Sequence, residues 1–267
     1  MNMTVEKEKP EKIKVRDNLY QYYYIDEDDD APNSIFACIN GENKKALLID
    51  TAYAKFSEKV KKDLEENGIE PEIVILSHYH PDHAAGAAVF AGCPIYASRY
   101  YENNYENCQV WRPDLTFVRP THLINNGDSL TFGSFHLTFT YAPGHSRCLV
   151  LTFINDDVLH VGDLLMFSKD DKPTLPYISD GGGFKQHIQS LELLKTIDYN
   201  TMLIPHGHFL NDKDKITEDI DERIYYLQRL LDSDGSPSLA ECLKKDISRY
   251  ANPEFHNINL IQLMGEL

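Results

Sequence analysis

A chain of 267 residues with 42% hydrophobic and 25% charged side chains has the composition of a folded globular protein. Its 26 Lys and Arg against 42 Asp and Glu give a net charge of −16, which disfavours nucleic acid as a partner because phosphates are repelled. No apolar stretch approaches the roughly 20 residues that cross a bilayer, so no membrane partner is expected. A charged N-terminus without an apolar signal segment, and five cysteines without a CxxC pair, favour a cytoplasmic location.

The first hundred residues predict mainly strands. A polar turn between two apolar runs near residue 41 is typical of a hairpin, and apolar residues spaced by four predict a helix over 55–67. The continuous apolar run 73–76 indicates a strand that is buried on both faces. A short helix is expected over 84–90. The predicted strands cover 13–16, 19–25, 34–39, 46–49, 73–76 and 94–97.

The rest of the chain predicts loops, more strands and then helices. Residues 98–114 read as an irregular aromatic loop that could roof a pocket, and 168–183 as a Gly- and Pro-rich loop. Strands are predicted over 115–118, 129–132, 135–141, 148–154, 158–161 and 201–204, and helices over 184–197, over 212–231 and from 239 onward. Two runs of strands, each followed by helix, suggest two packed sheets with helices outside. We expect one domain over 12–235, with 236–267 as its C-terminal helical extension.

The most informative segment is the run His78-Tyr79-His80-Pro81-Asp82-His83, directly after the buried strand. Three imidazoles and a carboxylate packed this tightly are costly to bury unless a cation neutralises and orients them. The spacing of two between His78 and His80 indicates an extended backbone, because metal-binding pairs on a helix are four apart. Six residues cannot complete two metal positions, so further ligands must come from elsewhere in the chain.

Three later candidates stand beside glycines at the ends of predicted strands. His145 follows Pro143-Gly144, and Asp163 follows Gly162. The third is a histidine of the segment Pro205-His206-Gly207-His208, in which either imidazole could be the ligand. Glycine lets the backbone turn sharply, so that the side chain beside it can point inward at the edge of a sheet.

As a set, these elements resemble the metallo-β-lactamase superfamily of metal-dependent hydrolases. The pattern HxHxDHxxG is complete, and the Pro-Gly-His, Gly-Asp and Gly-His elements follow in the family's order. The early Ile49-Asp50-Thr51 resembles the family's strand-end Asp. The resemblance spans about residues 18–210. It implies an α/β fold, a four-layer αββα sandwich with the site at one edge. Two features depart from the family's pattern. The last element reads Pro-His-Gly-His, and Arg147-Cys148 replaces the small residues that often follow the third motif.

The resemblance further implies two divalent metal ions, most readily Zn, with Fe or Mn as alternatives. Asp163 would bridge them and Asp50 would orient the His loop from behind. We take His208 rather than His206 as the last ligand, because Gly-His is the family order. The implied ligand set is His78, His80 and His145 for the first ion, and Asp82, His83 and His208 for the second.

The implied activity is hydrolysis of a small ester, thioester or lactone by a hydroxide that the two ions activate, with Asp82 as the catalytic proton carrier. The partner would be a small-molecule substrate, and the oligomeric state stays open. Three alternatives remain: a phosphodiesterase or RNA-processing nuclease of the same fold, a mononuclear iron persulfide oxygenase, and a non-catalytic metal-binding regulator. Loops 98–114 and 168–184 would set specificity. His187, on the helix after the glycine run, is a further candidate to face the cleft.

Overall fold

Strand β3 (Pro32–Asn40) is buried on both faces because its apolar side chains alternate between two cores. Phe36 and Cys38 pack into one hydrophobic cluster, and Ile35 and Ala37 pack into another. Successive side chains of a strand point to opposite faces, so a strand that is apolar throughout needs a covering layer on each side. The run 73–76 behaves in the same way, as its sequence predicts.

Two sheets form the centre of the molecule in this computed structural model, which describes residues 10–26, 31–233 and 237–266. The first has the order β1-β2-β3-β4-β5-β6-β7 and the second β12-β11-β10-β9-β8. The first sheet contains β1 (Glu11–Arg16), β2 (Leu19–Ile25), β3, β4 (Lys45–Ile49), β5 (Glu70–Ile75), β6 (Ile95–Ser98) and β7 (His122–Ile124). The second contains β8 (Ser129–Phe132), β9 (Phe135–Tyr141), β10 (Val150–Ile154), β11 (Val158–His160) and β12 (Thr201–Leu203). The charged start of the chain and the acidic run 27–30 lie outside the described residues.

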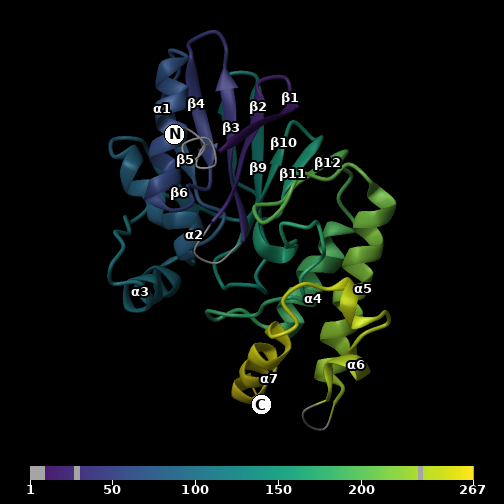
Figure 1. Ribbon diagram of the computed structural model, residues 1–267. Helices are drawn as coiled ribbons and strands as arrows, with labels where there is room; N and C mark the ends of the chain where they lie inside the picture. Colours follow the sequence, from purple (N-terminus) through teal and green to yellow (C-terminus); the bar gives the residue numbers. More distant parts are fainter. Residues whose placement is uncertain (1–9, 27–30, 234–236, 267) are drawn as a thin grey trace, which may run out of the picture.

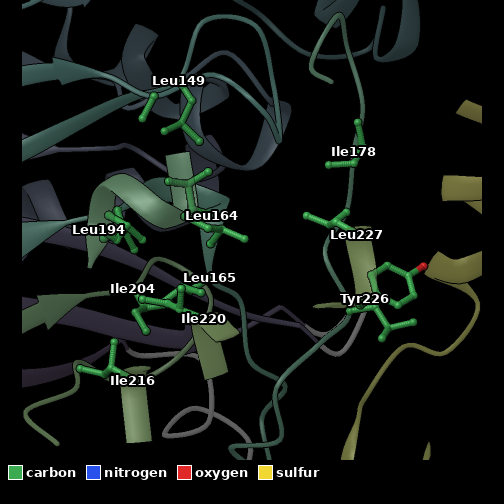
Figure 2. Packing of buried hydrophobic residues seen from close by; sticks show 14 of the residues in the cluster. Leu149, Leu164, Leu165, Ile178, Leu194, Ile204, Ile216, Ile220, Tyr226 and Leu227 are labelled. Carbon is green, nitrogen blue, oxygen red and sulfur yellow. The ribbon is translucent and has the colours of Figure 1, made fainter. Parts of the chain in front are cut away.

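Helices cover the outer face of each sheet (Figure 1). On the first sheet lie α1 (Ala54–Glu66), α2 (Pro81–Ala84), the 3₁₀ helix η1 (Ala85–Phe90) and α3 (Glu102–Trp111). On the second lie α4 (Phe184–Leu194) and α5 (Lys213–Leu231), and α5 contacts α6 (Leu239–Cys242) and α7 (Phe255–Glu266). Figure 2 shows Leu194 of α4 and Ile216 and Ile220 of α5 in the outer core of this second sheet. The predicted αββα sandwich is confirmed.

Parallel pairing gathers several strand ends at one edge of the sandwich. β4 and β5 pair in parallel with Ile49 opposite Ile75, and β11 and β12 pair in parallel with His160 opposite Leu203. The residues that follow parallel strands therefore leave each sheet on the same side. Two short 3₁₀ helices, η2 (Gly162–Leu164) and η3 (Ile247–Arg249), lie in the later connections. None of the helices in the described part of the chain has the length and hydropathy that a membrane span requires.

Two predicted elements are wrong. The expected loop 98–114 contains the helix α3, whose polar sequence hides its pattern because only Asn104 and Cys108 are buried. The segment 115–118 is no strand, although its apolar side chains pack beside the first sheet's outer core and Val118 accepts a hydrogen bond from Tyr79. Apolar burial and strand pairing are separate requirements, and here only the first is met.

A substitution at Gly86 would test how closely the segment that carries the histidines approaches α1. A Cβ at this position would overlap the carbonyl oxygen of Thr51 and the hydroxyl group of Ser57, whereas one at Gly41 would meet nothing within 4 Å. We expect Gly86→Ala to lower the free energy of unfolding by about 1–3 kcal/mol, because overpacking forces the backbone apart. Gly41→Ala should change it by less than about 0.5 kcal/mol. Chemical denaturation of both variants measures this, and equal losses would contradict the close approach.

Candidate metal centre

The strand ends bring the predicted site residues to one place. β5 leads into Ser77 and His78, β11 leads into Asp163, and β12 leads into His206. The turn at His145 is held directly against α4, because a Cβ on Gly144 would overlap the backbone of His187. Glycine at 144 is therefore what allows the imidazole beside it to reach the edge of the sandwich.

A first group of donors gathers around the Nδ1 atom of His80. His78 Nε2 lies 3.1 Å from this atom and His145 Nε2 lies 2.9 Å from it. Asp163 Oδ2 is 3.4 Å from His145 Nε2 and 3.7 Å from His78 Nε2. All four side chains are buried, and their ligand atoms lie within 4.8 Å of one another.

A second group consists of Asp82, His83 and His206. The Nε2 atoms of the two histidines are 3.3 Å apart, and Asp82 Oδ2 lies 3.2 Å from His206 Nε2. Asp163 Oδ2 is 3.3 Å from His83 Nε2 and 3.2 Å from His206 Nε2. The Asp163 carboxylate thus stands between the two groups, in the position that a bridging ligand requires.

His208 does not belong to this cluster, so the choice of His208 over His206 is wrong. Its side chain is 42% exposed, stacks on Tyr23 with ring centroids 4.2 Å apart, and pairs with Asp171 on the surface. The backbone turns at Gly207, which has a φ of 145°, so the residue before the glycine points inward and the one after it points away. In this element the inward side chain, His206, therefore precedes its glycine, whereas His145 and Asp163 follow theirs.

Hydrogen bonds behind the imidazoles fix which nitrogen faces the centre. His83 Nδ1–H donates to Asp50 Oδ2 over 2.9 Å, His145 Nδ1–H to the Tyr177 carbonyl over 2.8 Å, and His206 Nδ1–H to the Pro32 carbonyl over 2.7 Å. Carboxylates and carbonyls only accept, so each ring must carry its proton on Nδ1. In the neutral ring, each Nε2 then presents a lone pair to the cluster, as a metal ligand must.

Ser77 and Asp50 complete the same arrangement for His78. The Ser77 amide and hydroxyl groups donate to the two Asp50 oxygens over 2.7 and 2.8 Å. The Ser77 hydroxyl oxygen can then accept from His78 Nδ1–H over 3.0 Å, which leaves His78 Nε2 unprotonated. Asp50 therefore lies behind the His-bearing segment, in the orienting position that its sequence context predicts.

The two partners of His80 come from the Gly- and Pro-rich loop 168–183, but sequence reasoning named neither of these residues. Its Nε2 faces Ser179 Oγ at 3.3 Å and Asp180 Oδ2 at 3.8 Å, so its Nδ1 faces the donors of the first group. The Asp180 carboxylate is held by the amides of Asn104 and Asn107 on α3. These residues have no motif spacing, and the only sequence signal was a polar pair beside the Gly181–Gly183 run.

The residues present fit a pair of cations. Lone pairs of five imidazoles converge, and the second oxygen of Asp163 is buried without a hydrogen-bond partner in the described residues. Buried polar atoms are nearly always paired, so an unpaired carboxylate oxygen beside converging lone pairs indicates a missing ligand. Imidazole and carboxylate donors in this number suit Zn²⁺, with Fe and Mn as alternatives.

The histidines of the cluster differ in the direction in which their surroundings shift the imidazole pKa. Burial lowers the pKa of His145 to about 3 and that of His80 to about 4, more than nearby carboxylates raise them. Burial alone would also lower the pKa of His206, but Asp163 and Asp82 raise it to about 10. Burial opposes ionisation of Asp163, yet His206 and His83 hold its pKa well below the usual range. The carboxylates thus attract positive charge to this point, which a bound cation would supply.

The cluster opens into a cavity of about 340 Å³. Asp82, Asp163, His80, His145 and His206 form its floor, and aromatic and apolar side chains from several elements form its walls. The walls bring together Trp111 of the unexpected α3, the loop that carries Tyr177, and Phe255 of α7. His187 is fully buried behind Gly144 and does not line this cavity, so it does not face the cleft.

Known proteins resemble this chain in sequence and in fold. The model of the metallo-beta-lactamase superfamily matches residues 28–208. Glyoxylase B2 of Dictyostelium discoideum is 26% identical over 153 residues, which cover 49% of this chain and 51% of that protein. A hydroxyacylglutathione hydrolase of Photorhabdus laumondii is 30% identical over 125 residues, covering 46% and 44%. The chain therefore matches about half the length of these curated relatives. A metallo-beta-lactamase family protein of Thermus thermophilus has the same fold, with a TM-score of 0.68, 16% identity, and coverage of 94% and 95%.

The histidine pair at the end of β12 provides a matched test of the site. We expect His206→Ala to lose about one equivalent of bound metal, because it removes a lone pair from the second group. His208→Ala should keep the wild-type metal content, since its ring lies on the surface. Elemental analysis of both variants after reconstitution with Zn²⁺ measures the difference. Metal loss in His208→Ala with retention in His206→Ala would overturn the assignment.

Proposed function

This chain belongs to the metallo-β-lactamase superfamily, and we propose that it is a metal-dependent hydrolase of an ester, a thioester or a lactone. The observation that carries the proposal is the pair of donor groups joined by Asp163, open to a cavity of substrate size. His78, His80 and His145 would hold one divalent ion, Asp82, His83 and His206 the other, and Asp163 would bridge them. We expect Zn²⁺ in both positions, because the donors are mostly neutral imidazoles.

When bound, two such cations supply a hydroxide at neutral pH and polarise the substrate oxygen. The reaction is balanced by water alone: its oxygen bonds to the carbonyl carbon, the bond to the leaving thiol or alcohol breaks, and the leaving group takes a proton. Asp82 lines the cavity and can hold that proton on a carboxylate oxygen and return it to the leaving atom.

The outward hydrogen bonds give the residues behind the site a defined part in this reaction. Hydrogen bonds position the imidazoles through Asp50, Ser77 and the carbonyls of Pro32 and Tyr177. The donor atoms are therefore in place before any ion binds. Partners of this kind change metal affinity by about 10–100-fold when they are removed. The geometry therefore favours a preorganised centre over one that assembles around the metal.

Charge and donor number weigh against the alternatives. A mononuclear iron oxygenase would leave Asp82, His83 and His206 without a bound metal ion, although their donor atoms lie within 4.8 Å of one another. A nuclease would need basic side chains for phosphates, but no Lys or Arg lines the cavity among the described residues. A regulator with a vestigial site would not need the full donor set. The hydroxyacylglutathione hydrolases among the relatives favour thioester cleavage.

The proposal is tested by removing a ligand from the first group. We expect His80→Ala to fold, to lose at least one metal ion, and to hydrolyse thioesters, esters or lactones more than about 100-fold slower than the wild type, since even outer partners cost 10–100-fold. The exposed His136 on β9 offers a control, because His136→Ala should keep both metal and rate. Circular dichroism, elemental analysis and initial rates give the three readouts. Wild-type metal content and rate in His80→Ala would refute the proposal.

A further inference from the structure

Apart from the histidines of the donor cluster, no cationic side chain lines the cavity among the described residues. Outside the cluster itself, the described lining residues are apolar, aromatic or neutral and polar. The apolar and aromatic members are Ala31, Pro32, Pro81, Trp111, Met166, Phe167, Tyr177 and Phe255. A carboxylate on the remote part of a substrate would therefore be desolvated against these walls without a partner, which is costly.

Four neutral polar side chains of the lining already make contacts within the protein. The Thr174 hydroxyl group donates to main-chain carbonyls, and the Ser179 hydroxyl group contacts His80. The Ser168 hydroxyl oxygen accepts from two backbone amides, and the Asn252 amide donates to Glu254. The walls consequently offer a remote substrate group mainly apolar contact.

Arg223 lies behind the Phe167 part of this wall, and it is not available to a substrate. Its guanidinium lies 5.7 Å from the centroid of the Phe167 ring, donates to the carbonyls of Thr174 and Met166, and faces Asp219 at 3.4 Å. The side chain is only 2% exposed. Arg223 therefore supports the segment that carries Met166 and Thr174 and adds no positive charge to the cavity surface.

We propose that the substrate is uncharged away from its reacting carbonyl and carries a compact apolar group that packs against Trp111, Phe167 and Phe255. This inference rests on the proposed hydrolase function and narrows its substrate class. Glutathione thioesters, which carry two carboxylates, would then be poor substrates, unlike those of the relatives named hydroxyacylglutathione hydrolase. The −16 net charge of the chain acts in the same direction by repelling anions.

The volume of the cavity sets the size of the group. At the roughly 30 Å³ that a water molecule takes in the liquid, about 340 Å³ holds on the order of ten non-hydrogen atoms. Lengthening the acyl chain within that limit should raise kcat/KM about 4-fold per CH₂, because each buried CH₂ contributes about 0.8 kcal/mol. Beyond that limit the gain should stop.

A matched substrate pair tests the charge preference. The full chain, loaded with two equivalents of Zn²⁺, is given the butanoyl thioester of N-acetylcysteine amide and the butanoyl thioester of N-acetylcysteine, which differ only in a neutral carboxamide in place of the carboxylate. We expect kcat/KM to be at least about 10-fold higher for the neutral thioester. The reason is that burying a carboxylate without a partner costs more free energy than one hydrogen bond to a charged group contributes. Equal or higher values for the anionic thioester would overturn the inference and leave the hydrolase function standing.

Binding separates the two proposals if neither thioester is cleaved. Trp111 is the only tryptophan of the chain and lines the cavity, so its fluorescence reports on occupants. The probes are the two ketones in which CH₂ replaces the thioester sulfur. Preferential binding of the neutral ketone without turnover of any thioester, ester or lactone would support the substrate class and refute the hydrolase. Binding of neither ketone, or preference for the anionic one, would overturn the substrate class.

Neighbouring residues on α3 provide a variant and its control. Trp111 is 49% exposed and lines the cavity, whereas Val110 is 75% exposed and does not. Trp111→Lys should shift the ratio of kcat/KM toward the anionic thioester by about 10-fold, because it supplies the missing cation without burying it. Val110→Lys adds the same charge outside the cavity and should leave the ratio unchanged. An equal shift in both variants would point to long-range attraction and contradict a role for the cavity wall.

Discussion

The candidate site depends on hydrogen bonds that hold the imidazole N–H groups away from the centre. Asp50, the carbonyls of Pro32 and Tyr177, and the Ser77 hydroxyl group each accept from a ring nitrogen on the outer side. Without these acceptors the rings could adopt either tautomer, and protons would point at one another across gaps of about 3 Å. With them, lone pairs converge on two points, and the carboxylate of Asp163 lies between those points.

These acceptors are spread over the whole fold, which explains why both sheets are needed for one site. Asp50 and His78 follow parallel strands of the first sheet, while Asp163 and His206 follow parallel strands of the second. Pro32 begins β3, and Tyr177 lies on the long loop before α4. Each donor group combines side chains from both sheets, so the packing of the sheets against each other assembles both groups, and any loss of that packing would pull each group apart.

The cavity is built from still more distant parts of the chain. α7 contributes Phe255, and its Asn259 holds the loop at Pro176 and Ile178 through hydrogen bonds of 2.7 and 3.1 Å. The Tyr177 carbonyl between them accepts from His145, so the C-terminal helix both lines the cavity and supports a donor of the cluster. A displacement of α7 would therefore change both the cavity wall and the position of His145.

The sequence alone determined the layers of the fold and most of the donor cluster, because both depend on short-range pattern. Alternating and continuous apolar runs identify strands, and the run from His78 to His83 places four ligand-type side chains in six residues whatever the rest of the chain does. Only the tertiary structure could decide between His206 and His208, because the direction in which the backbone turns at Gly207 depends on what packs beside it. The same holds for α3, Ser179 and Asp180, whose roles arise from contacts between segments far apart in sequence. Local pattern records which side chains are available, while long-range packing decides which of them meet.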